Sequence, residues 1–115
     1  MTTELIISFE LDGQHAWHDA PKQYEEFSRP HRHLFKFICW YPQGNSNDPT
    51  RRETELWELR MAAIDCIHES YMHLGNGAID FQDSSCEGIA QTLKARMKFS
   101  KVMVCEEWFL GAIVS

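Results

Sequence analysis

The chain has 115 residues and a formal net charge of −6, and its length is typical of one compact domain. Hydrophobic residues make up 43% of the sequence and charged residues 24%, which is the balance of a globular protein. The acidic charge and the lack of a basic stripe argue against nucleic-acid binding. No apolar run is long enough to cross a membrane, and the first residues lack the features of a signal peptide. We therefore expect a single cytoplasmic domain over residues 1–115.

The first half of the chain predicts two strands. The segment ELIISFELDG alternates apolar and polar residues, which predicts a strand that ends at Asp12-Gly13. Residues 14–30 are mixed in character and contain two prolines, so we expect a loop there. The segment HRHLFKFICWY predicts the second strand, and the turn-rich segment PQGNSNDPT follows it.

Two helices are predicted next. The first begins at Thr50, where Glu53 completes a capping box, and ends at Gly75. Its apolar face is predicted to consist of Leu56, Leu59, Ala63, Ile67, Tyr71 and Leu74. The segment NGAIDFQD predicts irregular structure. The second helix begins at Ser84, with Glu87 as the partner in another capping box. Its buried face is predicted to consist of Ile89, Leu93 and Met97.

The segments KVMVCEE and GAIV predict the last two strands. The order strand, strand, helix, helix, strand, strand is typical of an α+β fold, with a four-stranded antiparallel sheet and both helices on one face. Such a sheet has two edges with unpaired backbone groups, so we expect a homo-oligomer that pairs them. The cysteines are widely spaced in apolar patterns and form no Cys-x-x-Cys pair, which predicts reduced, buried thiols. They are Cys39, Cys66, Cys86 and Cys105.

Two histidines stand one residue apart at the start of the second predicted strand. His31 and His33 project to the same side of such a strand, and Arg32 projects to the other. Their imidazoles can converge on one metal ion, and a catalytic zinc ion usually takes a third protein ligand. His15 is the best candidate for that ligand, and His18 competes with it. Alternatively, His31 and His33 are polar residues at the partly exposed entry of an ordinary strand, because a His-x-His pattern is common by chance.

These histidines belong to a series of short motifs that come in a characteristic order. The motifs GQHAW, PHRHLF, SSCEGIAQTL and VMVCEEWFLGA are each weak alone. Together, over nearly the whole chain, they resemble the 6-pyruvoyl/6-carboxy-tetrahydropterin synthase family. The resemblance implies the tunnelling fold, in which ββααββ protomers join through sheet edges into a barrel. It also implies that His15, His31 and His33 bind Zn²⁺.

The resemblance further implies an organic ligand. Glu106 corresponds to the glutamate that binds the pterin ring in the family. Ser85 and Cys86 match a family motif at the start of the second helix, so the resemblance implies that they contact the ligand too. A carboxylate can accept two N–H bonds from the edge of a pterin or guanine ring, and Trp17 or Trp108 could stack on its face. From the residues alone, the preferred interpretation of Glu106 is a solvated acid at a strand end, with Glu107 as its twin.

The chain departs from the family at the catalytic residues. Phe27 stands where the family commonly has a catalytic cysteine. His73 is the nearest match to the catalytic histidine, with Asp65 or Asp80 as its partner. His73 and His68 are also explained as cations favoured near a helix C-terminus.

These departures favour a protein that binds without turnover. We expect it to hold a purine- or pterin-like small molecule or nucleotide in pockets between subunits, and to sequester it. The first alternative is a zinc-dependent carbon–oxygen lyase like the family's 6-pyruvoyl and 6-carboxy enzymes. The second alternative is a structural assembly subunit that binds no small molecule.

Overall fold

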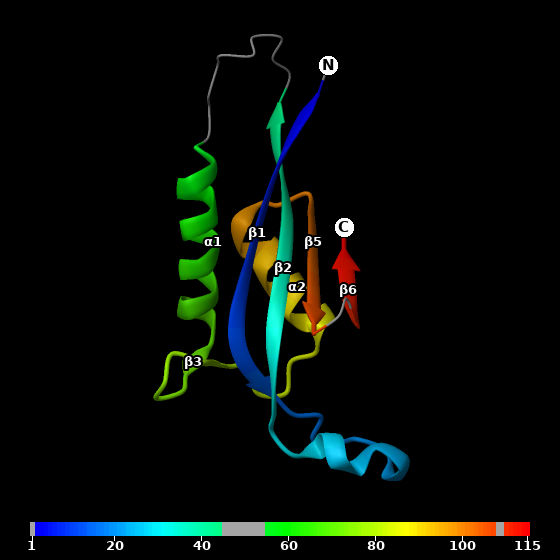
Figure 1. The fold of residues 1–115 in the computed structure, drawn as a ribbon. Helices are drawn as coiled ribbons and strands as arrows, with labels where there is room; N and C mark the ends of the chain where they lie inside the picture. The colour runs from blue at the N-terminus through cyan, green and yellow to red at the C-terminus, as the bar shows by residue number, and fades with distance from the viewer. Residues whose placement is uncertain (1, 45–54, 108–109) are drawn as a thin grey trace.

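The computed structural model describes residues 2–44, 55–107 and 110–115. In these residues the chain has an α+β fold, with a six-stranded mixed sheet and two α-helices (Figure 1). None of the helices in these ranges is both long enough and apolar enough to span a bilayer. The elements in chain order are β1 (Thr3–His15), the 3-10 helix η1 (Lys22–Ser28), β2 (His31–Gly44), α1 (Leu56–Ser70), β3 (Met72–His73), β4 (Ile79–Asp80), α2 (Cys86–Met97), β5 (Lys101–Glu106) and β6 (Leu110–Val114).

The strands lie in the order β3-β4-β1-β2-β5-β6. Antiparallel pairing joins β1 to β2, β2 to β5 and β5 to β6, as the sequence predicts for the four long strands. The sheet differs from the expected four-stranded one because β3 and β4 pair antiparallel and β4 adds to β1 in parallel. These extra strands have two residues each, and β4 lies in the segment that was expected to be irregular. A strand of two residues is too short to produce an alternating pattern.

Strand β1 continues past Asp12-Gly13 to His15, so the predicted end of the first strand was wrong. Gly13 does not form a turn; it lies where another part of the chain comes very close to the backbone of β1. A Cβ atom at this position would come within 2.5 Å of the Phe81 ring and 3.1 Å of the Ile79 carbonyl oxygen. The missing side chain therefore lets β4 and Phe81 lie directly against the end of β1.

Replacing Gly13 with alanine is expected to lower the free energy of unfolding by about 1–3 kcal/mol, because the buried Phe81 ring has to move to admit the methyl group. Urea unfolding of the purified variant measures this change. Gly75→Ala is the matched control, since a Cβ atom there meets no atom within 4 Å. Equal, small effects of the two substitutions would contradict the close-approach explanation.

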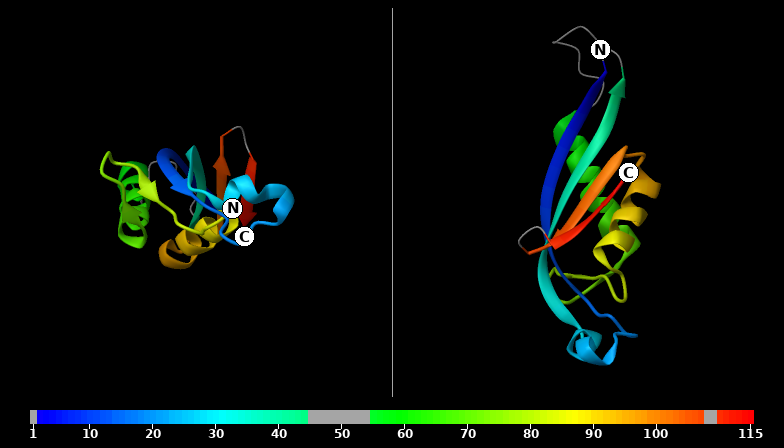
Figure 2. Two further views of the ribbon diagram at one scale, coloured as in Figure 1. Left: turned by 90° about the horizontal axis from the view of Figure 1, so that it is seen from below. Right: turned by 90° about the vertical axis from the view of Figure 1, so that its right-hand side faces the viewer.

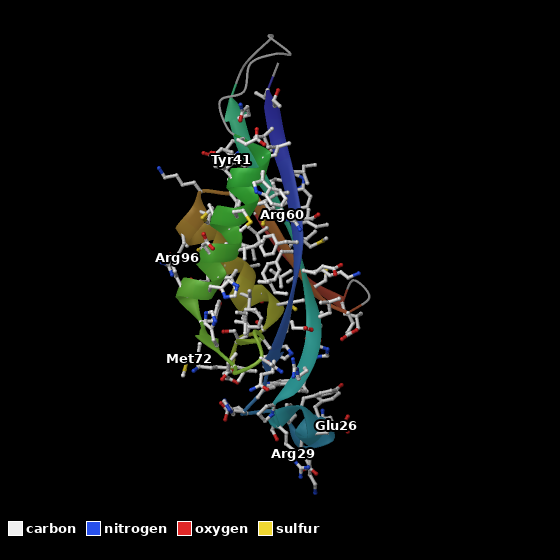
Figure 3. The ribbon with its side chains drawn as sticks, turned by 60° about the vertical axis from the view of Figure 1, so that its left-hand side comes forward. Glu26, Arg29, Tyr41, Arg60, Met72 and Arg96 are labelled. Atoms are coloured by element: carbon white, nitrogen blue, oxygen red, sulfur yellow. The ribbon has the colours of Figure 1, made fainter. Side chains whose placement is uncertain are left out.

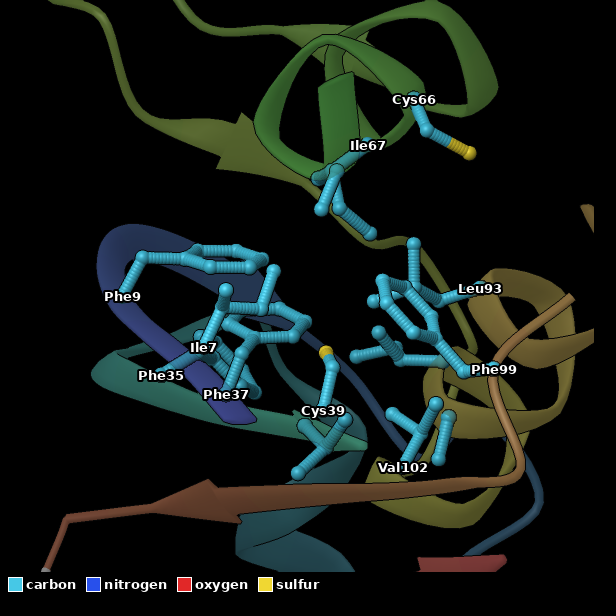
Figure 4. Close-up of a cluster of buried hydrophobic side chains, with 14 of the residues drawn as sticks. Ile7, Phe9, Phe35, Phe37, Cys39, Cys66, Ile67, Leu93, Phe99 and Val102 are labelled. Carbon is cyan, nitrogen blue, oxygen red and sulfur yellow. The ribbon is translucent and has the colours of Figure 1, made fainter. Parts of the chain in front are cut away.

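Both α-helices cover the same face of the sheet (Figure 2). The apolar core residues of β1, β2 and β5 come at every second position, and these residues meet the buried sides of α1 and α2 in one core (Figure 4). Phe9 and Phe37 stack at its centre, with their ring centroids 4.6 Å apart. The four cysteines are buried free thiols, as predicted.

Helix α1 is shorter than the sequence predicts. It ends at Ser70 instead of Gly75, because Tyr71 takes an extended conformation and packs its ring against Phe81 at 4.9 Å. The expected cap at Thr50 and Glu53 lies outside the described residues. Within the described part, Glu55 caps the helix by accepting a hydrogen bond from the backbone N–H of Trp57 at 3.2 Å. Leu56 is 47% exposed, so it does not belong to the buried face. That face consists of Leu59, Ala63, Cys66 and Ile67.

Helix α2 begins one residue later than predicted. Ser85, rather than Ser84, is its N-cap, and its hydroxyl oxygen accepts a hydrogen bond from the Gly88 N–H at 3.1 Å. This shift leaves the backbone carbonyl of Ser84 pointing away from the helix, toward the end of β1, where it meets His15.

Residues 16–30 form an arm that extends beyond the end of the sheet and carries the short helix η1 (Figure 1). Figure 3 shows Glu26 and Arg29 on this arm, at the opposite end of the molecule from Tyr41. The backbone N–H of Trp17 donates to the carbonyl of Phe27 at 2.7 Å and closes the base of the arm. The sequence predicted this region only as a loop.

Candidate metal centre

Four potential metal ligands share the helix-facing side of the sheet. Strand register pairs His15 with His31, Gly13 with His33, and Phe35 with Glu106. Along each strand, these ligands are an even number of residues from side chains of the buried core. They therefore lie on the same side of the sheet as the core residues, past the last residues that the helices cover. The prediction that His31 and His33 project to one side is consistent with this register.

The side chains of His15, His31, His33 and Glu106 converge. One potential ligand atom from each of them lies within 4.8 Å of the others. Glu106 Oε2 lies 2.8 Å from His15 Nε2 and 3.4 Å from His33 Nε2. The imidazole centroids of His15 and His31 are 4.6 Å apart. The three histidines predicted as ligands thus come together, and Glu106 joins them.

The other nitrogen of each ring faces an oxygen atom. His15 Nδ1 lies 2.9 Å from the Ser84 carbonyl, and His31 Nδ1 lies 3.0 Å from the Arg29 carbonyl. His33 Nδ1 lies 3.3 Å from Glu107 Oε1. Carbonyl and carboxylate oxygens can only accept, so they favour the tautomer in which Nδ1 carries the proton and donates it. In that tautomer each Nε2 keeps a lone pair, which is the arrangement of histidines that bind a metal ion.

Glu106 Oε2 is a buried oxygen whose nearest polar neighbours are His15 Nε2 at 2.8 Å and His33 Nε2 at 3.4 Å. A proton on Nε2 would make the shorter contact a hydrogen bond, and a metal ion between the two atoms can replace that proton. Three imidazoles and one carboxylate form a donor set that suits Zn²⁺. The residues present therefore fit a metal ion.

Burial lowers the pKa of His15 below its ordinary value of 6.5 and outweighs the Ser84 carbonyl and the Glu106 carboxylate, which both raise it. His31 and His33 face the same ring and lower its pKa further. The low pKa keeps the imidazole neutral near pH 7, and a neutral imidazole is the form that binds a metal ion.

The metal-free protein is expected to lose stability as the pH falls from 6.5 toward the lowered pKa of His15. In this range His15 takes up a proton in the unfolded chain but stays neutral in the folded one, so acid favours unfolding. Urea unfolding in a chelator at about pH 7.5 and about pH 5.5 measures the loss. A His15→Gln variant should lose less than the natural chain. An equal loss in both proteins would contradict this assignment.

A pocket of about 620 Å³ adjoins the four ligands. The rings of Trp17 and Phe27 and the side chain of Leu110 form apolar walls, and each of these side chains is partly exposed. The remaining lining residues are Ala16, Asp83, Ser84 and Ser85. Phe27 packs its ring against His31, with centroids 5.7 Å apart.

Of the residues predicted to contact an organic ligand, Glu106, Ser85 and Trp17 line this pocket. Cys86 is not among its lining residues. Cys86 lies buried in the first turn of α2, and burial raises the pKa of its thiol to about 12. The thiol is therefore protonated, and we assign it no contact with a ligand.

The other three histidines lie outside the cluster. His73, the predicted catalytic residue, is exposed on β3, where its Nε2 lies 3.3 Å from His68 Nδ1, and it does not line the pocket of the described chain. His18 is exposed and contacts Asp83, with His18 Nδ1 3.2 Å from Asp83 Oδ1. His15, rather than His18, is therefore the third histidine of the cluster.

Sequence reasoning missed the partners of the Nδ1 atoms. Glu107 was considered only as a twin of Glu106, whereas its carboxylate binds His33 and the Leu34 N–H. The Glu107 backbone has a φ of 55°, a left-handed conformation that is uncommon for residues other than glycine. The carbonyls of Ser84 and Arg29 leave no sequence signal, since every residue has a carbonyl.

A scan against models of known protein families finds no match to this chain, and a search of curated proteins finds none. The function therefore has to be inferred from the site itself.

Proposed function

We propose that the chain binds Zn²⁺ through His15, His31 and His33 and holds a purine- or pterin-like small molecule or nucleotide in the adjoining pocket. The observation that carries the proposal is the pocket itself, in which a metal-binding cluster and exposed aromatic walls meet. A volume of about 620 Å³ is in the range of small-molecule sites.

The walls of the pocket suit a flat, nitrogen-rich ring. The Trp17 side chain is 47% exposed and can stack on a heterocycle, and Phe27 offers a second apolar surface. The carboxylates of Glu106 and Asp83 can accept N–H bonds from the ring edge. An acidic pocket of this kind favours the amino and imino groups that pterins and purines share.

Sequestration is favoured over turnover because the catalytic thiol and the catalytic histidine that the resemblance implies are missing from the pocket lining of the described residues. Phe27 stands where the resemblance implies a catalytic thiol, and every cysteine of the chain is buried. His73 lies on β3, outside the lining residues of the described chain. A site with a metal and a carboxylate anchor but without a positioned base binds its ligand unchanged.

Assembly into a tunnelling-fold homo-oligomer is part of the proposal. Strand β6 is one edge of the sheet, and β1 is paired with β4 only at Gly13 and Gln14. Most of the outer side of β1 therefore offers unpaired backbone groups to another subunit. Leu110, on the edge strand β6, also lines the pocket, so a neighbouring subunit at this edge would help to enclose a ligand.

Titration calorimetry of the zinc-loaded protein tests the binding proposal. Guanine nucleotides, adenine nucleotides and pterins are titrated separately, and at least one of them is expected to give saturable heat. Trp17→Ala should weaken that binding, because it removes the stacking surface. Trp57→Ala is the matched control, since Trp57 is 63% exposed on α1 and does not line the pocket. Absence of heat with every compound would contradict the proposal.

The second candidate is a zinc-dependent lyase of the tetrahydropterin synthase type. Three convergent histidines beside a pocket favour it, since the resemblance implies that arrangement in the enzymes. Incubation of the zinc-loaded protein with dihydroneopterin triphosphate tests it by product formation. Loss of turnover in His73→Ala would support the predicted base, and unchanged turnover would remove His73 from the mechanism.

A further inference from the structure

We propose that Glu106 is the fourth ligand of the metal ion, so that a shell of three histidines and one glutamate closes around the ion when the pocket is empty. Glu106 must then leave the metal before a bound molecule can use either the carboxylate or the open coordination position. The inference rests on the proposed function, because it gives Glu106 two exclusive roles, metal ligand and anchor of the organic molecule.

The position of Glu106 supports metal binding. Bonds of about 2.0 Å in a tetrahedral zinc site place the ligand atoms about 3.3 Å apart. Glu106 Oε2 lies 2.8 Å from His15 Nε2 and 3.4 Å from His33 Nε2, on either side of that value. The carboxylate therefore lies where a ligand of the ion would lie, beside the Nε2 atoms of two other proposed ligands.

The burial of Glu106 Oε2 supports the same role. Apart from the Nε2 atoms of His15 and His33, the described residues offer this oxygen no partner, and a buried carboxylate oxygen without a partner is costly. A metal ion shared with the three Nε2 atoms removes that cost. The Nδ1 atoms of the three histidines already meet an oxygen, so their Nε2 atoms and Glu106 Oε2 are the atoms of the cluster that can share the ion.

Glu106 can leave without dismantling the histidines. The Nδ1 atoms of the histidines contact the Ser84 and Arg29 carbonyls and the Glu107 carboxylate, and these contacts remain when the Glu106 side chain moves. Glu106 is the last residue of β5, its side chain is 28% exposed, and the pocket beside it is open space that can receive the carboxylate.

The closed shell has a consequence for binding. A metal ion with four protein ligands has no position for an outside ligand, whereas one with three keeps a position open. A molecule in the pocket must therefore displace Glu106 from the metal, or donate its N–H bonds to the carboxylate after Glu106 has moved off the metal. The affinity for the organic molecule is then reduced by the cost of breaking one metal–carboxylate bond. Glu106 thus controls access to the metal in addition to binding the molecule.

Cobalt substitution tests the closed shell without any organic molecule. Co²⁺ takes the place of Zn²⁺, and its visible absorption reports the number and kind of its ligands. Azide is expected to leave the spectrum of the natural Co²⁺ protein unchanged. In Glu106→Ala, azide should enter the vacated position and shift the spectrum, and the Co²⁺ affinity should fall at least about tenfold.

Glu107→Ala is the matched control, because it removes the neighbouring carboxylate that holds His33 but keeps all four proposed ligands. Its affinity should also fall, but azide should leave its spectrum unchanged. The proposal is overturned if the natural protein takes up azide as readily as Glu106→Ala, if both bind Co²⁺ equally well, or if neither binds Co²⁺. The azide titration of the natural protein decides the matter even where a variant fails to fold. Because no heterocycle is used, failure here is distinct from failure of the calorimetry.

Discussion

Replacing His31 with alanine is expected to weaken Zn²⁺ binding by roughly 100- to 1,000-fold, since one ligand of a protein zinc site contributes several kcal/mol of binding free energy. His31 is the best histidine to remove, because its Nδ1 partner is the carbonyl of Arg29, an exposed residue at the base of the arm. Truncation at that position leaves no buried group without a partner. Competition against a chromogenic chelator at neutral pH measures the affinity.

His18→Ala is the matched control for this experiment. His18 lies three residues after His15 but is exposed, pairs with Asp83 and lies outside the cluster. Its replacement should leave the Zn²⁺ affinity within about twofold of the natural value. If His18→Ala and His31→Ala have equal effects, the ion binds nonspecifically to surface histidines, and the assignment of the cluster is wrong.

Removal of the metal is expected to lower the melting temperature by roughly 10–20 °C. A ligand present at 1,000 times its dissociation constant stabilises the folded state by about 4 kcal/mol, and each kcal/mol shifts the midpoint of a domain of this size by several degrees. The site joins β1, β2 and β5, so the bound ion cross-links three strands. Calorimetric melting with added Zn²⁺ and with a chelator measures the shift.

His31→Ala should show a much smaller difference between the two melting conditions, because it has lost a ligand. The chelated natural protein and the chelated variant should then melt at similar temperatures. A midpoint that is independent of Zn²⁺ in the natural protein would contradict metal binding in the folded state. Together with an unchanged stability of His31→Ala, it would favour the structural assembly subunit.

The alternation of residues along the strands predicted much of the site. It places His31 and His33 on one side of β2. The predicted first strand stops at Asp12-Gly13, however, and only the longer β1 of the structure brings His15 opposite His31. The order of the long strands and the two helices also followed from periodicity, because each of these elements is long enough to show a repeat.

What the sequence did not predict depends on contacts between distant segments. The end of β1 was misplaced because Asp12-Gly13 has the composition of a turn, whereas Gly13 is required by the Phe81 ring. The cap of α2 was assigned to Ser84, although the neighbouring Ser85 caps equally well by composition. Only the folded chain brings the Ser84 carbonyl to His15.

The position of Glu106 is the clearest limit of the sequence reasoning. The resemblance implies a ring anchor, and no local pattern distinguishes an anchor from a metal ligand. The distinction lies in the pairing of Glu106 with Phe35, two residues from His33, which turns the carboxylate toward the histidines. Such a relation between strands cannot be read from one strand alone.

Elemental analysis of the purified chain shows whether the histidine cluster holds a metal ion. The protein is prepared without a metal-affinity step, dialysed against metal-free buffer and measured by plasma mass spectrometry. The natural protein should contain about one zinc ion per chain, and His31→Ala less than about a tenth of that. A natural protein that contains no zinc and takes none up when Zn²⁺ is added would contradict metal binding by the cluster.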